Sequence, residues 1–92
     1  MARLKPEQPE RLAEKLKRIR LALGFTQEKM LNALQEVTHK KAKLHFGYIT
    51  RFETGTRTPS LLILLAYARL AGVSTDVLID DMLELPDKFH YL

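Results

Sequence analysis

The side chains most able to do chemistry are too few and too scattered to build a catalytic or metal site. The chain has no cysteine, which removes disulfides, thiolate zinc ligands and a thiol nucleophile together. Its two serines, Ser60 and Ser74, stand where helix caps are expected, and the adjacent Asp80 and Asp81 would diverge on a helix. The spacing typical of metal ligands is absent from the three histidines, His39, His45 and His90. The sequence therefore predicts no enzyme, no metal and no cofactor.

The charge is unevenly distributed along the chain. The formal net charge is +4, but the part up to Pro59 carries 13 Lys and Arg against 6 Asp and Glu, a net +7. From Ser60 onward there are 2 basic against 5 acidic residues, a net −3. A basic N-terminal two-thirds indicates a face for a polyanion such as nucleic acid. Ordinary solvated charge on a basic protein explains the same counts equally well.

Apolar periodicity predicts an all-α domain, because no segment shows the alternation of a strand. Helical spacing is clearest where Leu12, Leu16 and Ile19 form one stripe, which leaves Lys15 off the buried side. We expect helices over Glu10–Leu23, from Thr26 onward, from Gly47 or Tyr48 to Thr54, over Leu61–Ala71, and from Ser74 or Thr75 to Pro86.

Local chemistry indicates where these helices begin and end. Thr26 and Ser60 are good N-caps, since a hydroxyl accepts from free backbone N–H groups, and Gly24 supplies a left-handed stop. In the last helix we expect Met82 to face inward. The segment Gln35–Phe46 has no strong breaker, so a longer helix, a loop or some of each remain open there.

Four short motifs occur in an order that resembles one family. They are Gly24-Phe25-Thr26-Gln27-Glu28, then Ile49-Thr50-Arg51-Phe52-Glu53-Thr54-Gly55, then Arg57-Thr58-Pro59-Ser60, then Ala71-Gly72-Val73-Ser74. From Leu12 to Asp80 the chain resembles the phage-repressor and Cro-like helix-turn-helix family, also called the xenobiotic-response-element family. The resemblance implies a compact five-helix domain whose second and third helices read DNA.

The resemblance also implies roles for individual residues. Gln27 would hydrogen-bond a phosphate and brace the recognition helix. Arg51 lies on that helix away from Ile49 and Phe52, so its spacing predicts that it faces solvent or the groove. There its guanidinium would take guanine O6 and N7, the alternative being a solvated arginine or a phosphate contact. Arg57 corresponds to a position that contacts the DNA backbone. Arg20 and Glu53 would form a structural ion pair rather than contact DNA. Residues around the recognition helix expected to meet DNA are His45, Gly47, Tyr48, Thr50 and Thr54.

An insertion between helices two and three departs from the family pattern. It occupies Gln35–Phe46 and carries Lys40, Lys41 and Lys43, which either embrace the flanking DNA or form a solvated surface. Phe46 is expected to be a core residue more often than a DNA-reading one. The expanded turn puts the contacts from the start of the recognition helix in question.

We divide the chain into an arm over 1–8, a helix-turn-helix domain over 9–86 and a tail over 87–92. The predicted function is sequence-specific binding of double-stranded DNA by a repressor-like transcriptional regulator. A homodimer is expected, through the edge of the last helix and the apolar tail residues Phe89, Tyr91 and Leu92, unless the tail folds back over its own core.

The alternative to a regulator is an antitoxin or a protein-interaction adaptor on the same fold, with a toxin or the transcription machinery as protein partner. The start lacks the apolar stretch of a secretory signal, and the longest apolar run, Leu61–Ala68, is too short to span a membrane. We therefore expect a cytoplasmic protein with no membrane partner.

Overall fold

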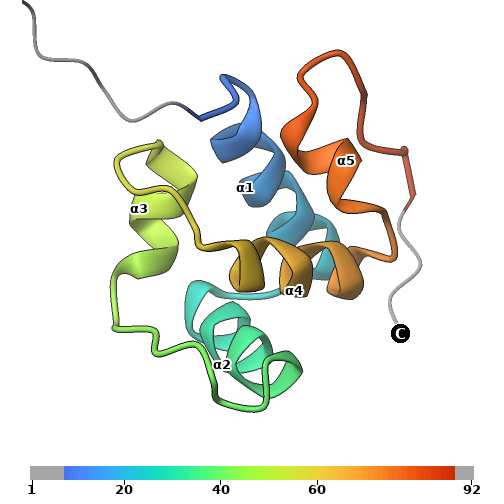
Figure 1. Ribbon diagram of the computed structural model, residues 1–92. Coiled ribbons are helices and arrows are strands. Elements are labelled where there is room, and N and C mark those ends of the chain that lie inside the picture. Colours follow the sequence, from blue (N-terminus) through green and yellow to red (C-terminus); the bar gives the residue numbers. More distant parts are fainter. Residues whose placement is uncertain (1–7, 89–92) are drawn as a thin grey trace, which may run out of the picture.

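The computed structural model describes residues 8–88, which form five α-helices and contain no strand (Figure 1). The helices are α1 (Leu12–Leu23), α2 (Gln27–Val37), α3 (Tyr48–Thr54), α4 (Leu61–Ala71) and α5 (Thr75–Ile79). The prediction of a compact all-α domain with five helices is confirmed. Within the described part of the chain, no helix is both long enough and apolar enough to cross a membrane.

Helix α4 lies at the centre of the packing. It contacts α1, α2 and α5, while α3 packs against α1 and α2 (Figure 1). This position explains the apolar residues on its buried side, whereas Leu61, Leu62 and Leu65 of the same helix are exposed. Seven of its eleven residues are buried, and the Tyr67 side chain is fully enclosed. Burial raises the pKa of the Tyr67 hydroxyl, since the phenolate would be desolvated.

Most of the helix ends expected from local chemistry are present, but Ser74 stands at the N-cap of α5 without a side-chain hydrogen bond to that helix. The Thr26 hydroxyl accepts from the backbone N–H of Lys29 at 3.1 Å, and Ser60 accepts from Ile63 at 3.3 Å. Gly24 ends α1 in the left-handed conformation, with φ 75°. These caps satisfy backbone groups that a helix terminus would otherwise leave without partners.

The start of α1 is set by a residue seventy positions away. The helix begins at Leu12 rather than Glu10, and the Asp81 carboxylate accepts from the backbone N–H groups of Glu10 (2.9 Å) and Arg11 (3.0 Å). These hydrogen bonds, led by the one from Arg11, lower the pKa of Asp81. Arg11 also pairs with Glu84 at 2.7 Å. The segment after α5 is thereby attached to the first turn of α1.

Lys15 is buried, contrary to the expectation that it lies off the apolar stripe. Its side chain is 0% exposed, and its ammonium donates to the carbonyls of Val77 (2.8 Å), Asp80 (3.0 Å) and Leu83 (2.8 Å). An ammonium has three donors, so the three carbonyls satisfy it completely. Lys15 therefore contributes to the basic count of the sequence but not to the surface.

The last helix is shorter than predicted. Helix α5 ends at Ile79, and Met82 is 87% exposed instead of facing inward. The chain turns at Asp80, whose side chain accepts from the backbone N–H of Met82 at 2.9 Å, an Asx turn that competes with helix continuation. Leu85, 4% exposed, is the residue of this segment that belongs to the hydrophobic core.

The open question about Gln35–Phe46 is resolved as a short helical continuation followed by a loop. Helix α2 runs to Val37, and the Thr38 hydroxyl donates back to the carbonyl of Leu34 at 3.0 Å. His39 and Lys40 then have positive φ values of 53° and 62°. Two partly buried residues of the loop, Ala42 and Leu44, pack against the core.

The two ends of the chain are only partly within the described residues. Gln8, assigned to the N-terminal arm, donates through its side chain to the carbonyl of Gly55 (2.9 Å) and accepts from the hydroxyl of Thr58 (2.8 Å). The rest of the arm, residues 1–7, lies outside the described residues, as do His90 and the expected dimer contacts Phe89, Tyr91 and Leu92.

Candidate nucleic-acid interface

Helix α3 has one buried side and one open side. Ile49 (2% exposed) and Phe52 (3% exposed) insert into the core, which attaches the helix to the rest of the domain. Thr50, Arg51 and Thr54 are exposed on the remaining surface. A seven-residue helix is too short to be stable alone, so its orientation depends on this packing.

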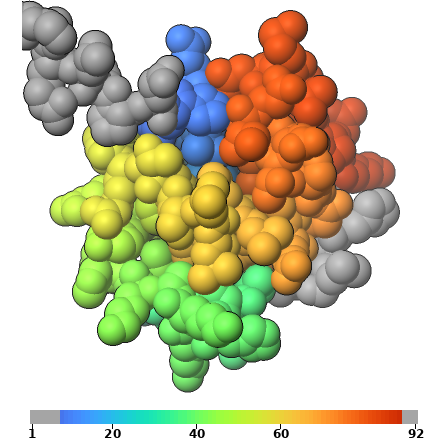
Figure 2. All heavy atoms as spheres, viewed as in Figure 1, coloured from blue at the N-terminus to red at the C-terminus, as the bar shows by residue number. Residues whose placement is uncertain are grey.

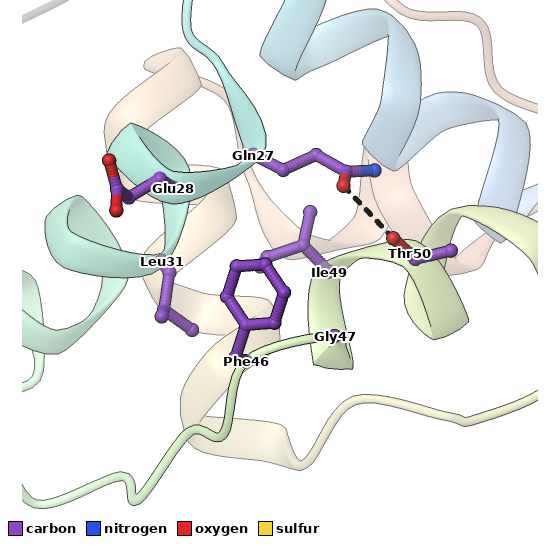
Figure 3. Close-up of a pocket in the computed structure, with 7 residues that line it drawn as sticks. All are labelled: Gln27, Glu28, Leu31, Phe46, Gly47, Ile49 and Thr50. Carbon is purple, nitrogen blue, oxygen red and sulfur yellow. Dashed lines mark hydrogen bonds between the residues drawn. The ribbon is translucent and has the colours of Figure 1, made fainter.

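Gln27, the first residue of α2, connects the two helices through its side chain. Its amide oxygen accepts from the Thr50 hydroxyl at 2.9 Å (Figure 3). Its amide nitrogen lies 3.5 Å from the Glu53 carboxylate. The first contact is a good hydrogen bond and the second is marginal. The amide group of Gln27 is exposed and keeps N–H capacity for a further acceptor.

Arg20 and Glu53 form a bidentate ion pair between α1 and the end of α3. The distances are 2.6 Å and 3.0 Å, and the two side chains are only 12% and 4% exposed. Arg20 also donates to the carbonyl of Phe25 at 2.9 Å. The hydrogen bond to Glu53 raises the pKa of Arg20. This pair neutralises the one acidic residue of α3 and holds the helix against α1.

Tyr48 connects the start of α3 with the loops on either side of it. The Arg57 guanidinium lies over the Tyr48 ring at 4.1 Å, and His45 meets the same ring edge-on, with centroids 5.2 Å apart. Cation–π contact places Arg57 beside the helix while its N–H groups remain at the exposed surface. Lys43, Tyr48 and Arg57 line one groove of about 210 Å³.

A comparison with protein families decides what this arrangement is. A helix-turn-helix family model matches residues 16–78, about two-thirds of the chain, from within α1 to α5. The chain belongs to the Cro-like helix-turn-helix family. Membership implies DNA binding, and domains of this family are typically non-catalytic. No curated protein and no solved structure gives a significant match to the chain.

In this helix-turn-helix protein, α2 and α3 correspond to the helix pair for which the family is named, and the loop between them leaves residues of α3 exposed. Thr50 and Arg51 are exposed, as is Thr54, whose hydroxyl lies 3.4 Å from the carbonyl of Arg51 and 3.2 Å from the Thr56 hydroxyl. Gly47, with φ 98°, precedes the helix in a conformation that side chains other than glycine rarely adopt.

The lysines of the insertion lie on the surface. Lys40, Lys41 and Lys43 are all exposed, and Lys40 and Lys43 line one shallow hollow beside Leu44. In Figure 2 the chain from the insertion through α3, coloured green to yellow, forms one continuous part of the molecular surface. The insertion therefore adds positive charge beside the helix-turn-helix pair.

Phe46 is not a core residue, contrary to expectation. Its side chain is 88% exposed, because the loop returns to α3 with Leu44 facing the core and Phe46 facing outward. Thr58 and Ser60, which line the groove of Arg57, and Glu28, which lines a hollow with Phe46, were not among the predicted site residues. Their signal in the sequence was their place in the family motifs Gly24–Glu28 and Arg57–Ser60, which indicated only the resemblance and the helix caps.

Proposed function

We propose that this protein binds double-stranded DNA sequence-specifically and regulates transcription by occupying its operator. The observation that carries the proposal is the open side of α3, where Thr50 and Arg51 are exposed and the single acid, Glu53, is buried in an ion pair. A helix of this kind fits the major groove, where each base pair has a distinct pattern of donors and acceptors.

Arg51 is the residue we propose to read a base. Its guanidinium is exposed on α3, and bidentate hydrogen bonding to guanine O6 and N7 supplies about 1–3 kcal/mol of discrimination. Thr50 is held by Gln27, so its methyl group is available to the groove while its hydroxyl is engaged. We thus assign base reading to Thr50 and Arg51, on a short helix with little conformational freedom.

Phosphate contacts are assigned to residues around α3. Gln27 stands at the N-terminus of α2, where an amide donor and free backbone N–H groups favour a phosphate. Tyr48 and Arg57 lie together beside α3. Contacts of this kind position the protein on the duplex without reading sequence. The positive surface is extended by the exposed lysines of the insertion, Lys40, Lys41 and Lys43.

A two-fold dimer on a pseudo-palindromic site is part of the proposal. One domain of this size covers a small footprint, so two copies on half-sites about 10 bp apart would supply the specificity that a genome requires. Ile79, 45% exposed at the end of α5, supports that helix as the contact surface. Analytical ultracentrifugation with and without operator DNA measures the stoichiometry.

Binding-site selection from random duplex DNA tests the function. The wild type should enrich a defined site, and Arg51→Ala should keep much of its affinity while losing preference at one position by roughly 5- to 150-fold. Arg69→Ala, a change of an exposed arginine on α4, is the matched control and should leave the selected site unchanged. Uniform weakening by Arg51→Ala would instead make Arg51 a phosphate contact.

A salt titration separates DNA binding from the adaptor alternative. For a protein that neutralises n phosphates, log K falls against log salt with a slope of about −0.9n. We expect a clear slope on random duplex DNA. No measurable binding at low salt would contradict the proposal and favour a protein partner.

A further inference from the structure

Phe46 is the most exposed large apolar side chain among the described residues, at 88%. It directly precedes Gly47, the N-cap of α3. A ring in this position is in water in the free protein, beside the part of the helix that approaches the DNA in the proposed function. An exposed aromatic residue next to a binding surface is informative, because burial of its area favours the bound state.

The ring of Phe46 closes one side of a small hollow between α2 and α3 (Figure 3). Leu31 and Ile49 form its apolar lining, and Gln27 and Thr50 lie at its polar rim. The hollow has a volume of about 30 Å³. That volume is the size of one water molecule or one methyl group. Because the lining is apolar, it favours the methyl group.

The charges around the hollow decide which part of DNA fits it. Exposed lysines on the same loop, Lys41 and Lys43 among them, attract the duplex as a whole. The hollow itself is lined by one charged residue, Glu28, whose carboxylate would repel a phosphate. This charge disfavours the phosphate backbone and leaves a base edge in the major groove as the part of DNA that would fit the hollow.

We propose that Phe46 is a specificity-determining residue, with which the insertion reads the methyl group of a thymine beside the bases contacted by α3. The thymine C5-methyl is the apolar group that the major groove displays, and aromatic side chains contact it. The inference rests on the proposed DNA binding and adds to it a second reading element outside α3. The insertion then extends the recognition site and does not merely lengthen the turn.

The test compares selected sites and then removes a single methyl group. Phe46→Ala should lose the preference for thymine at one position next to the Arg51 position. The control Met82→Ala, at a residue 87% exposed in the segment after α5, should select the wild-type site. Replacing that thymine by deoxyuridine should weaken wild-type binding by about 4-fold, the effect of one buried methyl-sized group, and should leave Phe46→Ala binding unchanged.

The outcomes separate this inference from the proposed function. Suppose that the wild type selects a site and that Phe46→Ala discriminates thymine from deoxyuridine as strongly as the wild type does. Another residue then reads the methyl group, and the inference is wrong. The inference is also wrong if Phe46→Ala weakens binding to all DNA sequences equally. It is wrong as well if Phe46→Ala leaves DNA binding unchanged, a result that would favour a contact between Phe46 and a protein. If the wild type selects no site at all, the proposed function itself fails. Circular dichroism of both variants verifies that each is folded.

Discussion

Replacing Lys15 by methionine removes a buried charge while keeping nearly the same side-chain length and volume. In the wild type the ammonium donates to three carbonyls at 2.8–3.0 Å, two of them beyond the end of α5. Lys15→Met deletes all three hydrogen bonds and leaves the carbonyls to find other donors. The change therefore tests whether this ammonium holds the last segment of the domain against α1.

The expected loss follows from the structure. Hydrogen bonds to a charged group contribute about 1.5–3 kcal/mol each, so three give an upper bound of about 5–9 kcal/mol. Much of this is offset, because the variant no longer desolvates an ammonium. Asp80 and Leu83 are exposed residues, so their carbonyls regain water in part. We expect a net loss of about 2–4 kcal/mol in the free energy of unfolding, a large share of the ~5–15 kcal/mol typical of a domain.

Urea denaturation followed by circular dichroism measures this loss. The matched control is Lys17→Met, an exposed lysine on the same helix, which should change the free energy of unfolding by no more than about 0.5 kcal/mol. If Lys15→Met were as stable as the control, the three carbonyl contacts would contribute nothing net and the reasoning would be refuted.

Two further predictions concern the carboxylates of Glu53 and Asp81. Arg20→Met leaves the Glu53 carboxylate, 4% exposed, without its partner and should destabilise the domain by about 3–5 kcal/mol, whereas the double variant with Glu53→Met should recover part of the loss in a double-mutant cycle by thermal denaturation. Full additivity would show that the pair is not coupled. The pKa of Asp81 is lowered below its ordinary 3.8 by hydrogen bonds from backbone N–H groups, first that of Arg11. Its contribution is therefore present above the unfolded pKa and lost as pH falls through the folded pKa. Between pH 7 and pH 3 the Tm of Asp81→Asn should fall less than that of the wild type, with Asp87→Asn as the exposed control; equal falls would contradict this assignment.

The elements whose ends depend on neighbours in sequence were predictable. The Thr26 and Ser60 caps and the left-handed Gly24 act within one helical turn, so their residue types are sufficient evidence. The spacing of Ile49 and Phe52 likewise indicates which side of α3 is buried, and so leaves Arg51 on the open side. The family motif added the order of the helices and the partnership of α2 with α3.

Contacts between distant segments were not predictable in the same way. Helical spacing assigns Lys15 to the surface, because a local pattern carries no information that three carbonyls from residues 77–83 converge on it. The same holds for Asp81, which caps α1 from the far end of the domain, and for Met82, displaced from the core by the turn at Asp80.

The sequence by itself determined the caps at Thr26 and Ser60, the left-handed stop at Gly24 and the exposed arginine of α3, because these depend on interactions a few residues apart. Only the tertiary structure decided that Lys15 is internal, that the insertion leaves α3 open and that Phe46 faces outward. The physical reason is that hydrogen-bond satisfaction and burial are properties of the assembled domain: a polar or apolar side chain is placed by the groups that surround it after folding, and those groups come from remote parts of the chain.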